Sequence, residues 1–185
     1  MIMNFRKSIG RKIIHIYKSR KRKTFNATSD HCLNTVRSML EKSKYCFLIT
    51  NSNREWPSAR MVQPIIDFDT LSLWFGTNPS LRKVKEIEEN QNVTIAFGSV
   101  RENANLIIYG KAHIVRDIQK RKNHWIGSWL LFFPGGPKSD DFISIRVDPL
   151  EIELMNFRRS IVPEPFGLKP VKMIKTNGNW KVQED

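Results

Sequence analysis

The chain has 185 residues, of which 40% are apolar, and a formal net charge of +13 at pH 7. This length and apolar content predict a single domain with a substantial hydrophobic core. Two cysteines are too few for a disulfide scaffold, no apolar run is long enough to cross a membrane, and the N-terminus lacks the apolar segment of a secretion signal. We therefore expect a cytoplasmic protein in which Cys32 and Cys46 are buried or unreactive thiols.

The first predicted element is a basic arm over residues 1–28. Nine Lys or Arg residues and no acid fall within residues 1–24, so the other 161 residues carry a net charge of only +4. Three interpretations stay open: a solvated helix or flexible tail, a segment that contacts nucleic acid or an anionic membrane, and an organelle-targeting segment. A helix is favoured by apolar residues that recur every three to four positions, namely Phe5, Ile9, Ile13 and Ile16 or Tyr17.

A second helix is predicted from Ser29 to Glu41, with Ser29 or Asp30 as its N-cap. Its apolar residues follow helical spacing, so one side of this helix should face the core. These residues are Leu33, Val36, Met39 and Leu40.

About six short strands, separated by turns and single helices, should make up most of the remaining chain. Residues 51–55 are predicted as a hairpin loop, residues 118–131 as a helix rich in Trp and Lys, residues 133–137 as a rigid loop, and residues 158–185 as a loosely packed tail. Such a series of strands predicts a small barrel with helices over its ends. The β-prone runs are residues 45–50, 58–66, 71–75, 92–98, 105–115, 142–147 and 152–157.

The stretch from Leu71 to Asn90 reads as a strand, a sharp turn and a basic helix. Strand residues alternate in polarity up to Gly76, which predicts one buried face. Leu71, Leu73 and Phe75 would lie on that face, and Ser72 and Trp74 on the other.

The turn after this strand has the residues of a helix start. Asn78 is a favourable N-cap, and Pro79 suits the first helical position because its missing N–H would be unpaired there anyway. Free backbone N–H groups and a positive dipole end would then surround a basic first turn, which predicts a phosphate cradle; the alternative is a solvated basic helix start. That first turn would hold Ser80, Arg82 and Lys83.

Arg60 lies in the middle of the predicted strand 58–66. This strand and the strand 71–75 are expected to pair, which would allow Arg60 to approach a phosphate held by Lys83. No protein metal site is predicted, because the histidines lack ligand spacing and no Cys-x-x-Cys is present. P-loop and Gly-x-Gly-x-x-Gly motifs are absent too.

Four pieces of the chain, in this order, carry a resemblance to a known family. They are residues 46–50 with 57–62 (CFLIT and PSARMV), 73–78 (LWFGTN), 80–87 (SLRKVKEI) and 129–137 (WLLFFPGGP). From about Leu33 to Phe157 the chain resembles the flavin-binding split barrels of the pyridoxamine 5′-phosphate oxidase superfamily, and most of all the branch called general stress proteins.

The resemblance implies a mainly β, α+β protein: a six-stranded antiparallel split barrel with flanking helices over residues 29–157, dimeric, with two FMN sites at the subunit interface. It implies that one set of residues lines the flavin, that a second surrounds its phosphate, and that a third approaches from the other subunit. The first set is Arg60, Met61, Val62 and Phe75; the second is Thr77, Asn78, Ser80, Arg82 and Lys83; the third is Trp129, Phe133 and Gly135.

The chain departs from the true oxidase in two places. The strand after Arg60 continues Met-Val-Gln-Pro without the basic residue of the oxidase, and residues 156–160 are not its substrate-binding Arg-x-His run. These departures argue against pyridoxamine phosphate oxidation and favour a flavin-dependent oxidoreductase or a stress-related flavin-binding protein of unknown substrate. Two alternatives remain: a barrel that binds haem or a deazaflavin, and a non-enzymatic dimer whose basic arm binds nucleic acid or membrane.

Overall fold

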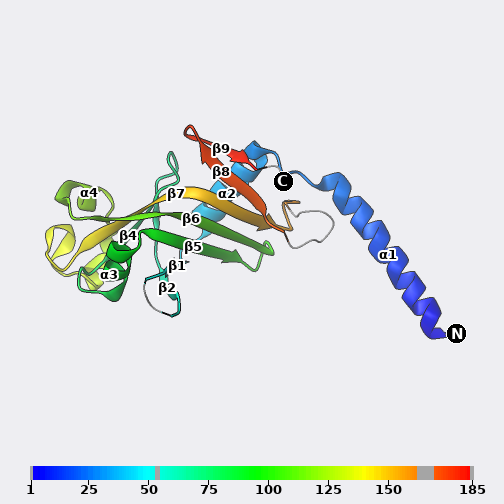
Figure 1. Ribbon diagram of the computed structural model, residues 1–185, viewed down its shortest axis with the longest axis horizontal. Helices are drawn as coiled ribbons and strands as arrows, with labels where there is room; N and C mark the ends of the chain where they lie inside the picture. Colours follow the sequence, from blue (N-terminus) through cyan, green and yellow to red (C-terminus); the bar gives the residue numbers. More distant parts are fainter. Residues whose placement is uncertain (1, 53–54, 162–168, 184–185) are drawn as a thin grey trace.

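The computed structural model describes residues 2–52, 55–161 and 169–183. The chain begins with α1 (Ile2–Thr24), a long helix that projects away from the rest of the molecule (Figure 1). The helix α2 (Ser29–Lys42) follows and packs its buried side onto the sheet. No helix in the described ranges combines the length and the apolar character that a membrane crossing requires.

The body of the molecule is one antiparallel sheet in the order β2-β1-β5-β6-β7-β4-β3, with β8 and β9 added beyond β7. Short helices connect several of its strands (Figure 1). The strands are β1 (Cys46–Thr50), β2 (Ser58–Val62), β3 (Ile65–Ile66), β4 (Leu73–Thr77), β5 (Asn92–Ser99), β6 (Ala104–Val115), β7 (Ile143–Asn156), β8 (Val171–Thr176) and β9 (Asn179–Val182). The helices are α3 (Arg82–Glu89), α4 (Ile118–Asn123) and two 3-10 segments, η1 (Gly127–Leu131) and η2 (Gly136–Lys138).

The predicted strand 58–66 is interrupted, and the interruption explains the barrel. Its first part, β2, pairs with β1, whereas its second part, β3, pairs with β4 at the other end of the sheet. Only Gln63 and Pro64 separate the two parts, and Pro64 has no backbone N–H to donate to a ladder. One short stretch therefore reaches both ends of the strand order, so that the sheet curls into a split barrel. The expected pairing of the strand 58–66 with the strand 71–75 is confirmed for Ile65 and Ile66, but it was wrong for β2, the part that carries Arg60.

The core lies inside this curled sheet. Alternate residues of the central strands are fully buried, as a sheet with one enclosed face requires. From α2, Val36 and Leu40 join the same cluster, but Leu33 is only partly buried. Cys32 and Cys46 are also in the core as free thiols, and burial raises their pKa values to about 11 and about 12.

Several expected boundaries were wrong. The N-cap of α2 is Thr28 rather than Ser29 or Asp30, and its side chain makes no capping hydrogen bond. The predicted helix 118–131 ends at Asn123, and a 3-10 turn follows it. The hairpin loop 51–55 lies partly outside the described residues.

The predicted strands 142–147 and 152–157 are one continuous strand, β7. Gly110 on β6 pairs with Pro149 and Tyr109 pairs with Glu151, so Leu150 is an extra residue in a β-bulge. The bulge accommodates Pro149 within a long strand. A Cβ on Gly110 would meet the Asp148 carbonyl oxygen, so the strands approach closely here.

The C-terminal segment is not the loosely packed tail that its Pro and Gly content predicts. Residues 171–182 form the hairpin β8–β9, and β8 pairs with β7 through Glu151 to Leu154. Val171 and Met173 are part of the core. The hairpin therefore contributes a few apolar side chains to the main core. The Pro and Gly residues around them had made the whole segment read as a loop.

The strand β4 is buried on both faces, against the expectation of one buried and one open face. Trp74 is as inaccessible as its neighbours because it stacks on His124, with ring centroids 3.6 Å apart. The strand also continues through Gly76 to Thr77. Gly76 is needed there, because a Cβ would collide with the rings of Trp129 and Phe142.

Candidate functional site

A cluster of charged side chains lies where β1 and β2 meet α3. Arg60 on β2 donates from Nη2 to Glu86 Oε2 at 2.6 Å and from Nη1 to Thr50 Oγ1 at 2.6 Å. Arg60 was expected to approach the helix by pairing of its strand with β4. It does so through β1 instead, since Thr50 belongs to β1 and Glu86 to α3.

Glu86 is the buried centre of this cluster, with only 3% of its surface exposed. It accepts hydrogen bonds from Thr50 at 2.5 Å and Ser58 at 2.9 Å, and it forms ion pairs with Arg60 and with Arg82 (Nε, 3.0 Å). Burial raises its pKa, but these hydrogen bonds and the charge of Arg60 outweigh burial, so the pKa lies below its ordinary value. The carboxylate therefore stays ionised and fixes two arginines.

Lys83 has no such counterion. Burial, and after it the nearby charge of Arg60, lower the pKa of Lys83. Among the described residues no acid lies in ion-pair contact with its ammonium group. Arg60, Arg82 and Lys83 together outweigh the single charge of Glu86 by two, so the cluster favours an anion beside Lys83.

The turn that leads into α3 differs from the expected capping arrangement. Asn78 Oδ1 accepts from the backbone N–H of Ser80 at 2.9 Å and from its Oγ at 2.6 Å, which closes a turn before the helix. The N-cap is Leu81, and α3 begins at Arg82. Arg82 and Lys83 are thus the first helical residues, and their backbone N–H groups have no acceptor one turn earlier in the helix.

Thr77, at the end of β4, has a buried hydroxyl group without a partner among the described residues. The residue is 2% exposed, yet its hydroxyl has no hydrogen-bond partner in the part of the chain that the structure describes. Buried hydroxyls are normally paired, because an unpaired one has lost its hydration. Thr77 is followed by the turn that leads to Lys83.

The other residues that were expected to contact the flavin lie in different environments, some on the surface and some in the core. Met61 is 64% exposed, Val62 is partly buried against the core, and Phe75 is a core residue. Trp129 is buried against Gly76, and Phe133 packs on Phe142 with ring centroids 4.9 Å apart; Gly135 is exposed. The structure thus brings together Arg60, Arg82 and Lys83, and it places Trp129 behind β4 of the same chain.

The large apolar residues Trp125, Trp129, Leu131, Phe132 and Phe133 fall into two groups. Trp125, Trp129 and Phe133 form a cluster with Phe142 inside the chain. In contrast, Leu131 and Phe132 are largely exposed, at 83% and 73%. Only the second group is available to another surface.

The strand β2 is paired on one side only. Its described partner is β1, so its other edge carries backbone N–H and C=O groups that are free for a ligand. Arg60 and Met61 are successive residues and point to opposite faces of the strand. Met61 borders a cavity of about 550 Å³ with mostly apolar walls, to which Phe47 and Phe157 contribute.

Three residues of the site, Glu86, Thr50 and Ser58, were not predicted from the sequence. The four-residue spacing from Arg82 to Glu86 is a signal that could have identified the acid, because such pairs meet on one helix face. Nothing in the sequence near Thr50 indicates its contact with Arg60, which depends on the register of β1 against β2.

A family model described as pyridoxamine 5′-phosphate oxidase like matches residues 31–161. No significant match is found among curated proteins.

Among solved structures, a Clostridium acetobutylicum protein related to general stress protein 26 gives a TM-score of 0.65 at 19% identity, over 77% of this chain and 93% of that chain. General stress protein 26 from Bacillus anthracis gives 0.60 at 20% identity, over 68% and 94%. A pyridoxamine 5′-phosphate oxidase-related, FMN binding protein from Nostoc punctiforme gives 0.59 at 16% identity, over 84% and 94%. These likenesses show the split-barrel fold of that family.

Proposed function

Because the chain belongs to the pyridoxamine 5′-phosphate oxidase-like family, we propose that it is an FMN-binding protein whose phosphate site is formed around Lys83. The observation that carries this proposal is a half-buried lysine beside Arg60 with no acidic partner among the described residues. A phosphate there would supply the missing negative charge and accept charge-assisted hydrogen bonds. The Nostoc punctiforme structure, named as FMN binding, supports the same ligand.

Two further features fit this ligand. The unpaired hydroxyl of Thr77 could donate to a phosphate oxygen, which would remove its unsatisfied state. The free edge of β2 offers backbone groups along which a flat, polar-edged ring can lie, in reach of both Arg60 and Met61.

Each residue then has a separate task. Lys83 holds the phosphate by charge, and Glu86 keeps the Arg60 guanidinium in place between Thr50 and the helix. When bound, FMN would supply transfer of a hydride or of single electrons, which is chemistry that side chains lack. We propose a flavin-dependent oxidoreductase of unknown substrate, with no side chain assigned as catalytic acid or base.

The test compares FMN with riboflavin, which lacks the phosphate, by fluorescence titration. We expect FMN to bind at least ten-fold more tightly, and Lys83→Glu to remove most of that preference, because one charge-assisted contact contributes roughly 1.5–3 kcal/mol. Lys85→Glu is the matched control, since Lys85 is an exposed residue of the same helix. Equal affinities for the two flavins would contradict the phosphate assignment.

The absorption spectrum of the purified protein distinguishes the other cofactors. Flavin bands would support FMN, whereas a Soret band or a deazaflavin spectrum would show that the barrel binds a different group. This measurement needs no substrate.

We further propose that the protein is a homodimer with each flavin site at the interface. An apolar row crosses the open face of the sheet through paired positions on β2, β1, β5 and β6, and such a face is typical of an interface. The row is Met61, Phe47, Ala96 and Ile107. Sedimentation at falling concentration, with flavin absorbance followed in parallel, tests the shared site. A monomer with full flavin occupancy would contradict it.

One observation favours an additional role for α1. This helix projects from the body (Figure 1). Its exposed side chains include Ile13, Ile16 and Tyr17, and it carries many cations. Exposed apolar side chains add to electrostatic attraction on a lipid surface, so we propose contact with an anionic membrane. Co-sedimentation with vesicles that contain phosphatidylserine should depend on residues 1–24. Binding to nucleic acid but not to vesicles would contradict this role.

A further inference from the structure

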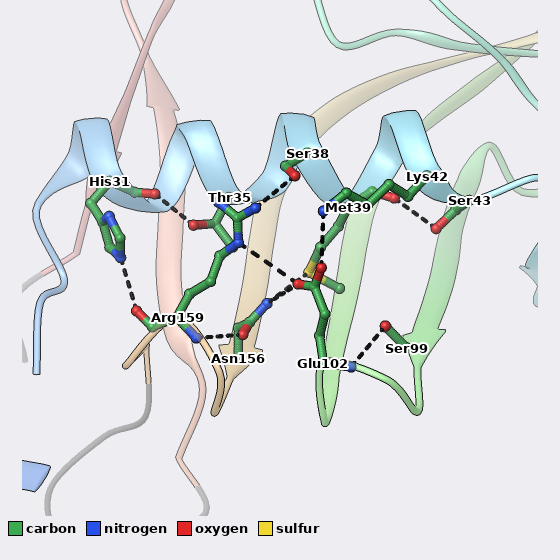
Figure 2. Close-up of polar contacts among 10 residues, drawn as sticks. All are labelled: His31, Thr35, Ser38, Met39, Lys42, Ser43, Ser99, Glu102, Asn156 and Arg159. Carbon is green, nitrogen blue, oxygen red and sulfur yellow. Dashed lines mark hydrogen bonds and ion pairs between the residues drawn. The ribbon is translucent and has the colours of Figure 1, made fainter.

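We propose a second anion-binding site, which takes a phosphorylated small molecule with two or more negative charges. It is a cavity of about 820 Å³ where the end of α2, the turn between β5 and β6 and the end of β7 meet (Figure 2). We call it the basic cavity. It is lined by Lys42, Ser99, Arg101, Glu102, Arg158 and Arg159.

The basic cavity is organised by one buried acid, Glu102. It accepts from Lys42 Nζ at 3.1 Å and from Asn156 Nδ2 at 2.9 Å, and Arg159 Nε lies 3.8 Å from its Oε2 (Figure 2). The hydrogen bonds from Asn156 and Lys42 outweigh burial and hold the pKa of Glu102 below its ordinary value. Its charge is therefore already engaged by Lys42 and Arg159.

The turn that carries Arg158 and Arg159 is fixed on both sides. Asn156 Oδ1 accepts from the backbone N–H of Arg159 at 2.9 Å, and Arg159 Nη2 donates to Ser38 Oγ at 2.8 Å. His31 Nε2 lies 3.0 Å from the Arg159 carbonyl oxygen, which ties the turn to the start of α2 as well (Figure 2). The backbone of this turn is therefore preformed, and the protein would lose less conformational entropy when a ligand binds.

The turn between β5 and β6 is held in the same way. Ser99 Oγ accepts from the backbone N–H of Glu102 at 3.3 Å, and the Asn103 carbonyl accepts from the N–H of Phe157 at 3.2 Å. Arg101 thus stands on a turn that is joined to the neighbouring turn after β7.

Two guanidinium groups of the basic cavity have no counterion within the described ranges. Arg101 and Arg158 make no ion pair with any residue that the structure describes. Four cations and one carboxylate line the cavity, so it carries a net charge of +3. Like charges held together raise the free energy of the folded chain, and a multiply charged anion would remove that cost.

One guanidinium group can donate two parallel hydrogen bonds to the oxygens of a phosphate. This geometry favours phosphate over a monovalent anion. The cavity is also large enough for an organic portion beside the phosphates. It is separate from the Lys83 site, because Thr50 pairs with Val93 at the start of β5, whereas Ser99 ends that strand.

The experiment is isothermal titration of the full-length protein with inorganic diphosphate and with ADP at low ionic strength. We expect both to bind, and the double variant Arg101→Glu/Arg158→Glu to bind each about ten-fold more weakly or worse. The double variant Lys111→Glu/Lys122→Glu makes the same change of net charge at exposed positions outside the cavity. Because the Lys83 site also attracts phosphate, each titration is repeated in the Lys83→Glu background.

Retained binding in Lys83→Glu and in the control variant, with loss in the Arg101 and Arg158 variant, would support the basic cavity. Equal weakening in the control variant would show a general charge effect and overturn the site. Loss of all binding in Lys83→Glu would assign the anion to the other site. Binding of diphosphate but not of ADP would overturn the proposal that the ligand has an organic portion beside its phosphates.

Discussion

Two buried glutamates organise two regions of this molecule, and they do so in different ways. Around Glu86, all the partners come from one corner of the barrel: β1, β2 and the helix of Glu86 itself. Around Glu102, the partners come from α2 and from the end of β7, which lie far apart in the sequence. Glu86 thus fixes a local site, whereas Glu102 joins three elements of the fold.

The two regions also differ in which cations they leave over. Among the residues that the structure describes, a single half-buried lysine near Glu86 lacks a counterion, and near Glu102 two exposed arginines do. A buried carboxylate that is fully paired sets the position of the surrounding cations, and the cations beyond its capacity determine where an anion can bind. The same principle therefore supports both proposals, the flavin phosphate site at one end of β5 and the second anion site at the other.

The largest effect is expected from Glu86→Ala. Removing this carboxylate leaves Arg60 desolvated and without its ion pair, which should cost about 3 kcal/mol of unfolding free energy. Urea denaturation measures the loss. Glu88→Ala on the same helix is the control, because its only described ion pair is with exposed Arg116, and it should change stability by less than about 0.5 kcal/mol.

Glu102→Gln should have the next largest effect. The amide keeps the shape of the side chain but loses the charge that pairs with Lys42 and Arg159, at a cost of roughly 1–2 kcal/mol. If Glu102 joins elements as proposed, hydrogen exchange should rise in both α2 and the end of β7. Faster exchange at only one of them would show that the two are held independently.

Acid should weaken both regions. Each glutamate has a pKa below its ordinary value in the folded state, so its stabilisation is present above about pH 4.3 and is lost as the pH falls through the folded-state value. The urea concentration at the unfolding midpoint, measured at pH 7, 5, 4 and 3, should decrease as the pH falls below about 4.3. In Glu102→Gln the fall should be shallower, and an unchanged slope would assign the acid sensitivity to other groups.

The smallest effect is expected from deletion of residues 1–24. The described side chains of α1 contribute nothing to the core, so neither glutamate region depends on them. The melting temperature should change by less than about 2 °C, and flavin binding should be retained. A larger shift would show that α1 packs on the body in solution.

The sequence alone determined the local elements around the turn between β4 and α3. The pattern in β4, the turn and the basic residues 82 and 83 predicted a strand, a turn and a cationic helix start, and all three are present. These features depend on neighbours within a few positions, where local preferences and periodicity act directly.

Tertiary structure decided how the segments are arranged and which charges remain available. The interruption at Gln63 and Pro64, the hairpin β8–β9, and the continuous β7 depend on partners far away in the chain. The ion pairs of Glu86 with Arg60 and of Glu102 with Lys42 do so as well, over 26 and 60 positions. A sequence shows how many cations a segment has, but only the folded chain determines which of them a buried carboxylate neutralises, because that depends on distance and desolvation.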